Sequence, residues 1–273
     1  MQRLRRFALA ETLRHPDILP SLPAGRWVRH AAPWLTVMII LGVWHWLSSA
    51  ALVPPSLLPS PFAVWEALVT SVTNGRLWLH TSVTLGEVLA GLGLGVTVGL
   101  GVGYCIARVP LLEALLSPLI ITLQSTPVVA YAPLLVIWFG SGATSKILIC
   151  ALITSFPLLM NTVVGIRGVP QRLRDLMRVS QANGWQTLML LEVPAALPVL
   201  LTGLKTSATL AVIGAVVGEF INASAGLGFL ITLARSQYDT PLVFVAVITL
   251  AVMARVLYGM VALLERWLLA WKQ

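Results

Sequence analysis

The sequence predicts an all-α, polytopic membrane protein with about six transmembrane helices. Of its 273 residues, 58% are hydrophobic and only 10% carry a formal charge, whereas about 25% of the residues in a soluble domain are charged. The mean hydropathy of +0.89 points the same way. This composition excludes an ordinary soluble enzyme and a disordered binding protein.

A helix needs about 20 residues to cross the roughly 30 Å hydrocarbon core of a membrane, and six apolar runs have about this length. They cover residues 33–53, 83–107, 119–139, 147–166, 198–220 and 241–263. We therefore divide the chain into a basic arm, residues 1–32, and a transmembrane domain, residues 33–273. Glu11 and Asp17 interrupt the arm, which favours a cytoplasmic segment before an uncleaved first span over a secretory signal.

A proline-rich stretch at 54–61 follows the first span. Residues 63–72 are expected to form a short helix along the outer membrane interface. Trp65 and Trp78 suit that depth, because an indole ring is half apolar and half polar. We interpret both tryptophans as interfacial anchors.

Four glycines recur every four residues in the second span: Gly91, Gly95, Gly99 and Gly103. This spacing puts them on one helix face, where another backbone can approach closely. A dinucleotide-binding turn is excluded, because it must follow a strand and open a helix. The pattern predicts tight helix packing, either within the subunit or with a second copy.

The third span is interrupted near its beginning by Gln124, Ser125, Thr126 and Pro127. Uncharged donors and acceptors at a helix break can bind a small polar solute weakly enough to release it. We therefore predict a translocation path at this break, extended by Tyr131 further along the span and by Asn161 in the fourth span. The alternative is that these polar side chains hold helices together.

Lys and Arg are unevenly distributed between the two sides of the predicted topology. With the first residue in the cytoplasm, the inner segments hold thirteen of them and the outer loops hold Arg76, Lys146 and Arg235. The positive-inside rule then puts both termini in the cytoplasm, and we expect a membrane protein in contact with lipid. The basic residues are too dispersed to form a nucleic-acid-binding stripe.

The longest polar interruption is the cytoplasmic segment 167–197, which exceeds what a minimal hairpin needs. Its composition favours short helices separated at Asn183 and Gly184. Pro194 and Pro198 suit helix boundaries, because proline lacks the amide that an interior helical turn requires. Such a segment can present a firm surface to a soluble partner. The alternative is a solvated basic loop that faces anionic lipid.

Within this segment, the string DLMRVSQANGWQTLMLLEVPAALPVLLTGLK resembles the cytoplasmic EAA loop of permease subunits in bacterial ABC importers, especially those for nitrate, sulfonates, taurine and pyrimidine precursors. Asp175, Leu176 and Met177 stand at the Glu-Ala-Ala positions. Gln181 replaces the family's glycine, and Asn183–Gly184 could supply a shifted turn. Strings such as TPVVAYAPLLVIWFGSG at 126–142 and GEFINASAGLGFLI at 218–231 extend the resemblance over residues 50–265, so the arm is not covered.

The resemblance implies the fold of a type I ABC importer permease and a non-catalytic membrane subunit. The implied partners are a second permease copy, two cytoplasmic ATPase subunits and an extracytoplasmic substrate-binding protein. ATP and Mg²⁺ would be held by the ATPases, and the sequence itself has no GxxxxGK(S/T) loop to cradle nucleotide phosphates. The residues expected to contact the ATPase are Asp175, Leu176, Met177, Arg178, Gln181, Ala182, Gly184 and Trp185.

Ionisable side chains within spans are costly and are therefore functional candidates. Lys205 can extend back to the inner interface. Glu219, near the outer end of the fifth span, either lines the solute path or caps the turn at 222–228, and a structural role beside Arg235 is a further alternative. Arg255 is interpreted as an inner-leaflet anchor.

Histidine and cysteine residues indicate no predicted site, and no metal site is expected. We interpret His45 as a hydrogen-bonded core or interface residue and place His80 in an outer loop. Cys105 and Cys150 lie in apolar runs, where a small thiol packs well.

Two other functions compete with the permease. A stand-alone secondary transporter or channel often has inverted repeats and paired broken helices, whereas this chain has one clear break and no convincing repeat. An intramembrane enzyme needs converging carboxylates, a metal cluster or an activated nucleophile, and the acidic residues and histidines are scattered. The leading prediction is a permease subunit that passes a small polar or anionic solute. Sulfonate, taurine, nitrate and pyrimidine precursors stay open, with a slight likeness to the last.

Overall fold

The computed structural model describes residues 26–50 and 53–270, which divide into two compact units between Pro55 and Ser56. The first unit contains α2 (Arg26–Ser49), the predicted first span. Most of the predicted arm, residues 1–25, lies outside the described residues. Its last residues, from Arg26, belong to α2.

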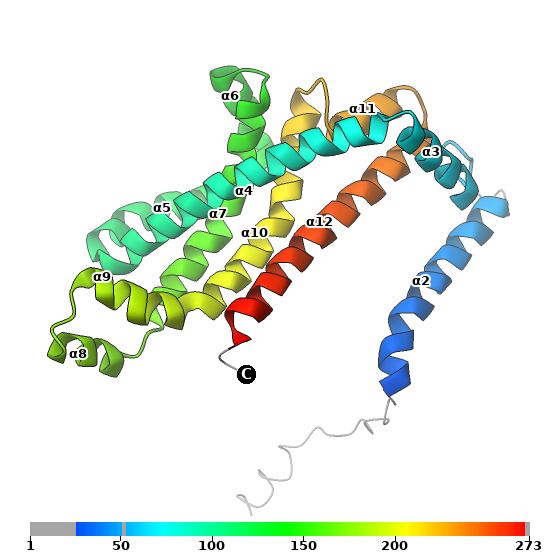
Figure 1. The fold of residues 1–273 in the computed structure, drawn as a ribbon. Coiled ribbons are helices and arrows are strands. Elements are labelled where there is room, and N and C mark those ends of the chain that lie inside the picture. Colours follow the sequence, from blue (N-terminus) through cyan, green and yellow to red (C-terminus); the bar gives the residue numbers. More distant parts are fainter. Residues whose placement is uncertain (1–25, 51–52, 271–273) are drawn as a thin grey trace, which may run out of the picture. The chain divides into compact units, whose positions relative to one another are not determined.

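The second unit contains the other described helices (Figure 1). In chain order these are α3 (Pro61–Thr73), α4 (Arg76–Arg108), α5 (Pro110–Ser125), α6 (Val128–Phe139), α7 (Ala143–Arg167), α8 (Gln171–Val179), α9 (Gly184–Thr187), the π-helix η1 (Leu188–Glu192), α10 (Val193–Ile221), α11 (Leu227–Ser236) and α12 (Thr240–Leu268).

Four helical runs of this unit are long and apolar enough to cross a membrane. They are α4, α7, α12 and the continuous run Gly184–Ile221, which joins α9, η1 and α10. The pair α5 and α6 forms a fifth span if its two arms, bent by 103°, count as one. With α2, these elements follow the order of the six predicted spans. The all-α prediction is confirmed within the described part of the chain.

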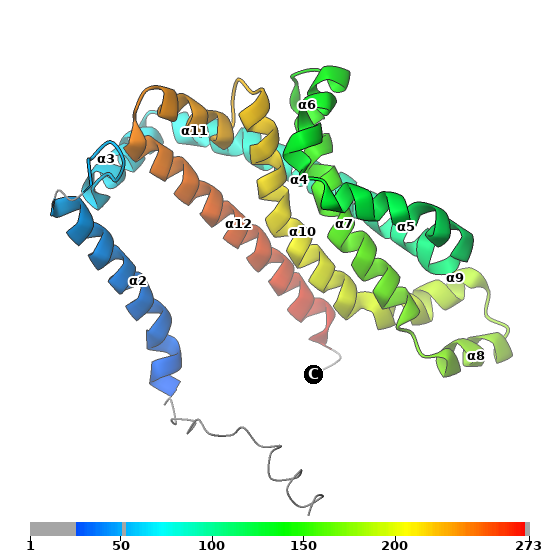
Figure 2. The same ribbon diagram turned by 180° about the vertical axis from the view of Figure 1, so that it is seen from behind.

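The glycine face of α4 packs against α7, which confirms the predicted close approach and places it within one subunit. A Cβ atom on Gly99 would lie 2.8 Å from the carbonyl oxygen of Ser155, and one on Gly103 would lie 2.8 Å from that of Leu159. Cys150 of α7 lies between Gly91 of α4 and Gly214 of α10, both of which leave room for it. Figure 2 shows α7 and α10 side by side, with α12 next to α10.

Several helices extend beyond the predicted spans because proline and polar residues are tolerated inside them. α5 begins at Pro110, so only Val109 separates it from α4. The helix of the predicted fifth span begins at Gly184, and Pro198 lies inside α10. α4 begins at Arg76, which puts His80 in a helix.

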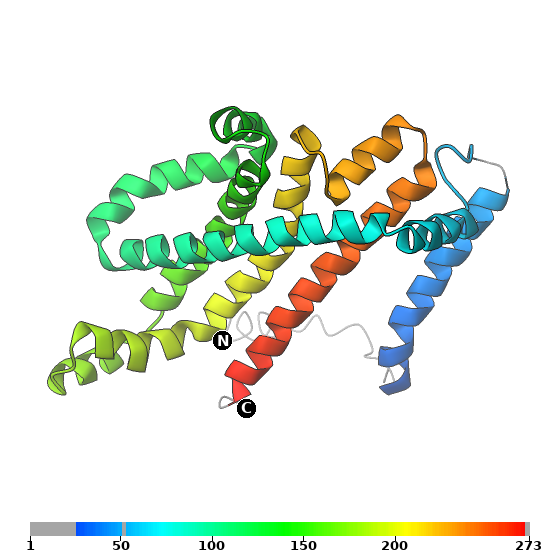
Figure 3. The same ribbon diagram turned by 45° about the horizontal axis from the view of Figure 1, so that its top comes forward.

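The predicted short helix at 63–72 is confirmed as α3. The side chain of Ser60 caps it by accepting a hydrogen bond from the amide of Ala63, 3.1 Å away. Figure 3 shows α3 and α11 at one end of the unit and α8 and α9 at the other.

The predicted break at Asn183–Gly184 is also confirmed. Asn183 caps α9, and its side chain and that of Gln186 bond each other's backbone amides. The shifted turn is not needed, however, because Gln181 itself adopts the left-handed conformation with φ of 53°. The turn therefore falls at the residue that replaces the family's glycine.

Candidate functional site

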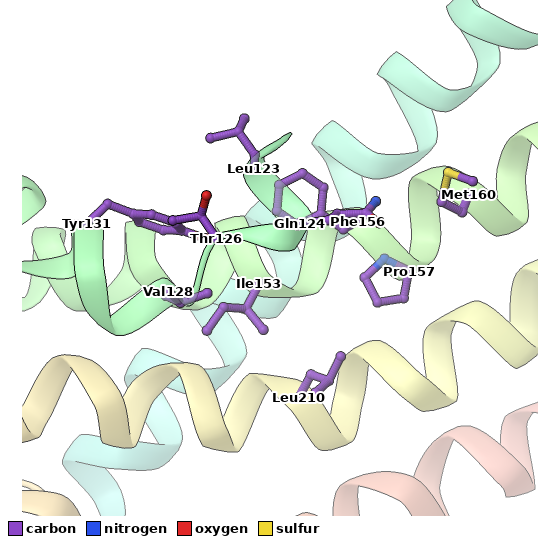
Figure 4. Close-up of a pocket in the computed structure, with 10 residues that line it drawn as sticks. All are labelled: Leu123, Gln124, Thr126, Val128, Tyr131, Ile153, Phe156, Pro157, Met160 and Leu210. Atoms are coloured by element: carbon purple, nitrogen blue, oxygen red, sulfur yellow. The ribbon is translucent and has the colours of Figure 1, made fainter. Parts of the chain in front are cut away.

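A cavity of about 310 Å³ lies at the break between α5 and α6, against α7 and α10 (Figure 4). Its size falls at the lower end of the range for small-molecule sites, about 300–1,000 Å³. The lining residues are Leu123, Gln124, Thr126, Val128, Tyr131, Ile153, Phe156, Pro157, Met160 and Leu210. Three of the predicted path residues, Gln124, Thr126 and Tyr131, are thus brought together.

The break that forms this cavity follows from Pro127. Proline disfavours a helical conformation in the residue before it, and Thr126 accordingly adopts an extended backbone with ψ of 126°. A second proline, Pro157, lies in the facing wall and provides no amide for the carbonyl of Ile153 one turn earlier. The cavity wall therefore offers a backbone acceptor as well as polar side chains.

The hydroxyl of Tyr131 is the most informative polar group of the cavity. It is buried and has no hydrogen-bond partner within the described part of the chain. A buried hydroxyl without a partner costs free energy comparable to a lost hydrogen bond. Thr126 instead donates to the carbonyl of Thr122 at 2.9 Å but keeps a free lone pair. The Tyr131 hydroxyl is thus an unused hydrogen-bonding group in a residue that lines the cavity.

None of the ten lining side chains carries a formal charge. The cavity consists of a few uncharged donors and acceptors on aliphatic and aromatic walls. An ion that loses its water shell needs a counter-charge or several hydrogen bonds in return. This composition suits a neutral solute with polar edges better than an anion.

The other predicted path residues lie outside this cavity. Ser125 donates to the carbonyl of Ile121 at 2.7 Å. The amide of Asn161 donates to the carbonyl of Pro157 at 2.8 Å, and its side chain packs against Gly203. Glu219 is only 2% exposed and lies in a different polar cluster. These geometries are those of structural side chains.

Glu219 caps the turn between α10 and α11. Its carboxylate accepts hydrogen bonds from the amide of Gly228 and from the hydroxyl of Thr84, the latter at 2.6 Å. Thr84 in turn accepts from the amide of Leu227 at 2.7 Å. Of the roles left open for Glu219, this geometry favours the turn cap, and no ion pair with Arg235 is found within the described residues.

His80 joins the same cluster and is not an outer-loop residue. It is buried in α4, and its Nδ1 accepts a hydrogen bond from the amide of Gly226 at 3.1 Å. Its position was misjudged because the second span is longer than its apolar core.

A buried ion pair between Glu87 of α4 and Lys146 of α7 was missed by sequence reasoning. The Lys146 Nζ and Glu87 Oε1 atoms are 3.1 Å apart, and both side chains are less than 10% exposed. Lys146 had been counted in an outer loop. The available signal was an acidic residue inside a predicted span, one turn before the glycine face begins at Gly91.

Lys205 and Arg255 have partners that the sequence did not reveal. Lys205 of α10 forms an ion pair with Glu265 of α12. Arg255 is exposed, and its guanidinium lies 5.9 Å from the ring centroid of Tyr258. The Lys205 ion pair thus joins α10 to α12, whereas the Arg255 contact lies within α12.

The predicted ATPase-contacting residues lie on α8, α9 and the turn between them, at one end of the second unit. Several large apolar side chains are exposed on this surface, and among them Leu176 is 60% exposed, Val179 83% and Trp185 66%. Together with exposed Asp175 and Arg178, they form an amphipathic protrusion. Exposed apolar groups gathered on such a protrusion are typical of a protein interface.

Ion pairs hold this end against the long helices. Arg108 of α4 and Glu192 of η1 are 2.6 Å apart, and the guanidinium of Arg167 binds both carboxylate oxygens of Glu113 at 2.8 and 2.7 Å. Glu192 was overlooked because it stands in an otherwise apolar string.

Comparison with known proteins agrees with these features. The family model described as binding-protein-dependent transport system inner membrane component matches residues 91–270, which include the cavity and segment 167–197. Among solved structures, an amino acid ABC transporter with histidines superposes with a TM-score of 0.58 at 19% identity, covering 73% of this chain and 97% of that one. At this identity the likeness concerns the fold.

Three relatives align with this chain over most of the length of both proteins. The riboflavin transport system permease protein RibX of Chloroflexus aurantiacus is 44% identical over 92% of this chain and 94% of its own. The putative aliphatic sulfonates transport permease protein SsuC of Bacillus subtilis is 33% identical, over 86% and 85%. The formylaminopyrimidine transport permease protein ThiX of Halalkalibacterium halodurans is 31% identical, over 88% and 96%.

Proposed function

The chain belongs to the family of binding-protein-dependent transport system inner membrane components, and on this premise we propose that it is the permease subunit of an ABC importer for a neutral, planar heteroaromatic solute. The permease function follows from the family. The solute class rests on the uncharged cavity at the break between α5 and α6.

The absence of charge in the cavity lining distinguishes charged candidate solutes from uncharged ones. Sulfonates and nitrate are anions, and taurine carries a sulfonate beside its ammonium group. Each would enter a cavity that supplies no counter-charge, at a cost of several kcal/mol for each ion. Riboflavin and formylaminopyrimidines have flat, uncharged ring systems with donors and acceptors along their edges. The aromatic ring and free hydroxyl of Tyr131 suit such a ring system.

The likeness to relatives supports the same choice. The riboflavin permease RibX is 44% identical to this chain, against 33% for the sulfonate permease SsuC. Identity alone would not decide between solutes, because specificity in a binding-protein-dependent importer also depends on the binding protein. The agreement between the cavity and the more similar relative carries the proposal.

The remaining subunits follow from the same family. We propose that the exposed surface of α8 and α9 binds a cytoplasmic ATPase subunit, which holds ATP and Mg²⁺. Two such subunits would act with two permease copies, and a binding protein would deliver the solute at the opposite end. This arrangement puts both termini in the cytoplasm of a bacterial cell.

Uptake into proteoliposomes tests the solute class. The complex of permease, ATPase and binding protein from the same organism is given MgATP and one of four labelled solutes: riboflavin, a formylaminopyrimidine, taurine or hexanesulfonate. We expect uptake of a heteroaromatic solute. Tyr131→Phe should lower its rate about 2- to 10-fold, the equivalent of one hydrogen bond of 0.5–1.5 kcal/mol.

Ser125→Ala is the matched control, because this neighbouring hydroxyl bonds the carbonyl of Ile121 and does not line the cavity. It should leave uptake within about twofold. Uptake of hexanesulfonate or taurine without riboflavin or the formylaminopyrimidine would overturn the solute class. Failure of the ATPase to co-purify with the permease would overturn the assignment of α8 and α9.

A further inference from the structure

Glu192 stands at the junction between segment 167–197 and the membrane helices. It is the last residue of η1, the π-helical turn that joins α9 to α10, and its side chain is completely buried. Arg108 approaches it from the end of α4, and Arg174 approaches it from α8. One buried carboxylate thus faces a cation from a long helix and a cation from the proposed ATPase-binding surface.

The two halves of this cluster differ in geometry. The Arg108 guanidinium donates to Glu192 Oε2 at 2.6 Å, a closed, charge-assisted hydrogen bond. Arg174 Nη2 lies 3.8 Å from Oε1, beyond hydrogen-bonding distance. Glu192 Oε1 and Arg174 Nε are both buried and without a hydrogen-bond partner in the described chain. The contact between Glu192 and Arg174 is therefore not closed by a hydrogen bond, whereas that between Glu192 and Arg108 is.

Arg174 can change its contact with Glu192 without disturbing that of Arg108. Its Nη2 donates to the carbonyl of Ile166, in the last turn of α7, so this guanidinium already lies between α7, α8 and η1. A shift of α8 by about 1 Å would bring Arg174 within hydrogen-bonding distance of Oε1. π-Helical turns such as η1 are often found at functional sites and can absorb such a shift.

We propose that Glu192 is a positioning residue for transport: it forms an electrostatic latch whose Arg174 half closes when the ATPase displaces α8. The closed latch ties the motion of α8 to α4 through Arg108 and to α10 through η1. A small displacement of α8 thereby switches the Arg174–Glu192 contact between two discrete states, hydrogen-bonded and separated. The proposal rests on the proposed function, because it assigns α8 and α9 to the ATPase.

The test uses the complete complex with ATPase and binding protein. Arg174→Gln opens the latch while leaving Arg108 to neutralise the buried carboxylate, so this variant should fold. Arg266→Gln removes the same charge from an exposed site in the last turn of α12, outside the surface assigned to the ATPase, and is the matched control. We expect Arg174→Gln to lower the amount of solute transported per ATP hydrolysed about 5- to 150-fold, the usual range for coupling between two sites. Arg266→Gln should match the unmodified complex.

A double-mutant cycle distinguishes the latch from a structural role. Glu192→Gln should be at least as severe as Arg174→Gln, because it also removes the charge that Arg108 binds, and the double variant should be no worse than Glu192→Gln, because the contact with Arg174 is already lost. Glu192→Asp, which keeps the charge but shortens the side chain, replaces Glu192→Gln if that variant does not fold. Lower melting temperatures with an unchanged ratio of solute to ATP would overturn the latch.

A spectroscopic measurement follows the latch directly. One spin label is attached to native Cys105, which is exposed on α4, and one to Ser180→Cys at the end of α8; Cys150 is buried. Labelled subunits are diluted so that only distances within one subunit are read. MgATP with vanadate should shift the distance between two discrete populations in the unmodified complex, and Arg174→Gln should give one broad population. Identical distributions in both would overturn the latch.

The proposed function and the latch fail in different ways. If the unmodified permease neither retains the ATPase nor transports any of the four solutes, both the proposed function and the latch are refuted. If the unmodified complex transports solute and the Arg174→Gln complex transports it with the same ratio of solute to ATP, only the latch is refuted.

Discussion

The contact between α4 and α7 predicts opposite effects for two alanine substitutions two residues apart. A Cβ on Gly99 would lie 2.8 Å from the carbonyl oxygen of Ser155 and 3.1 Å from the Cβ of Leu158, whereas one on Gly101 would have no atom within 4 Å. Both substitutions gain about 0.8–1.0 kcal/mol of helix propensity. Only Gly99→Ala also overpacks the contact, which costs about 1–3 kcal/mol. The difference between the two variants therefore isolates the packing cost.

Thermal unfolding of the purified protein in one detergent measures this difference. For a chain of this size, about 1 kcal/mol shifts Tm by roughly 2–4 °C, so Gly99→Ala should melt about 2–12 °C below Gly101→Ala. Gly101→Ala should melt at or slightly above the unmodified protein. Equal melting temperatures for the two variants would refute the close approach of α4 and α7 at Gly99.

Two further predictions concern charge and backbone conformation. Lys146→Met leaves the buried Glu87 carboxylate without its cation and should destabilise the protein by about 3–5 kcal/mol. Lys146→Met combined with Glu87→Leu should recover most of this loss, because both charges of the pair are gone and the neighbouring Glu219 keeps its hydrogen bonds from Thr84 and Gly228. Equal loss in the single and double variants, measured by thermal unfolding, would contradict this. Gln181→Gly should stabilise the turn after α8 by about 0.5–1 kcal/mol, because a side chain at φ of 53° is strained; a lower melting temperature would show that Gln181 makes compensating contacts.

The order of the membrane helices could be predicted from the sequence because it depends on local properties. Three of these properties can be recognised within short stretches of the sequence: the apolar runs of membrane-spanning length, the break at Pro127 and the glycine spacing of α4. The helix ends could not be predicted in the same way. Hydropathy falls where a helix leaves the apolar layer, but the hydrogen-bonded helix continues, as α4 does beyond its apolar core to Arg76.

The candidate site was predicted only where it coincides with the helix break. Gln124, Thr126 and Tyr131 belong to the break and line the cavity. Asn161 and Glu219 are polar residues in spans as well, yet Asn161 bonds the carbonyl of Pro157 on its own helix, and Glu219 bonds Thr84 of α4 and the amide of Gly228 beyond a turn. Sequence alone cannot tell a polar side chain that faces a cavity from one that satisfies a neighbouring helix, because both follow the same rule against unpaired polar groups.

The buried ion pairs were missed for a related reason. Glu87 and Lys146 are 59 positions apart, and Glu192 and Arg108 are 84 apart, so neither pair forms a local pattern. Each charge alone suggests a helix end or an exposed loop. Only the packing of α4 against α7 and of η1 against α4 brings the partners together.

These contacts distinguish a tightly packed block in the second unit from a less buried pair of helices, α5 and α6. α4, α7 and α10 are joined by the Glu87 ion pair, by the glycine contacts and, at the other end, by the Arg108–Glu192 bond. By contrast, α5 has no buried residue and α6 has only Ala132. Substitutions in α4, α7 and α10 should therefore have effects independent of those in α5 and α6, since the effects of distant sites are usually additive. Gly99→Ala should lower stability without altering which solute is transported, whereas Tyr131→Phe should alter transport with little change in Tm.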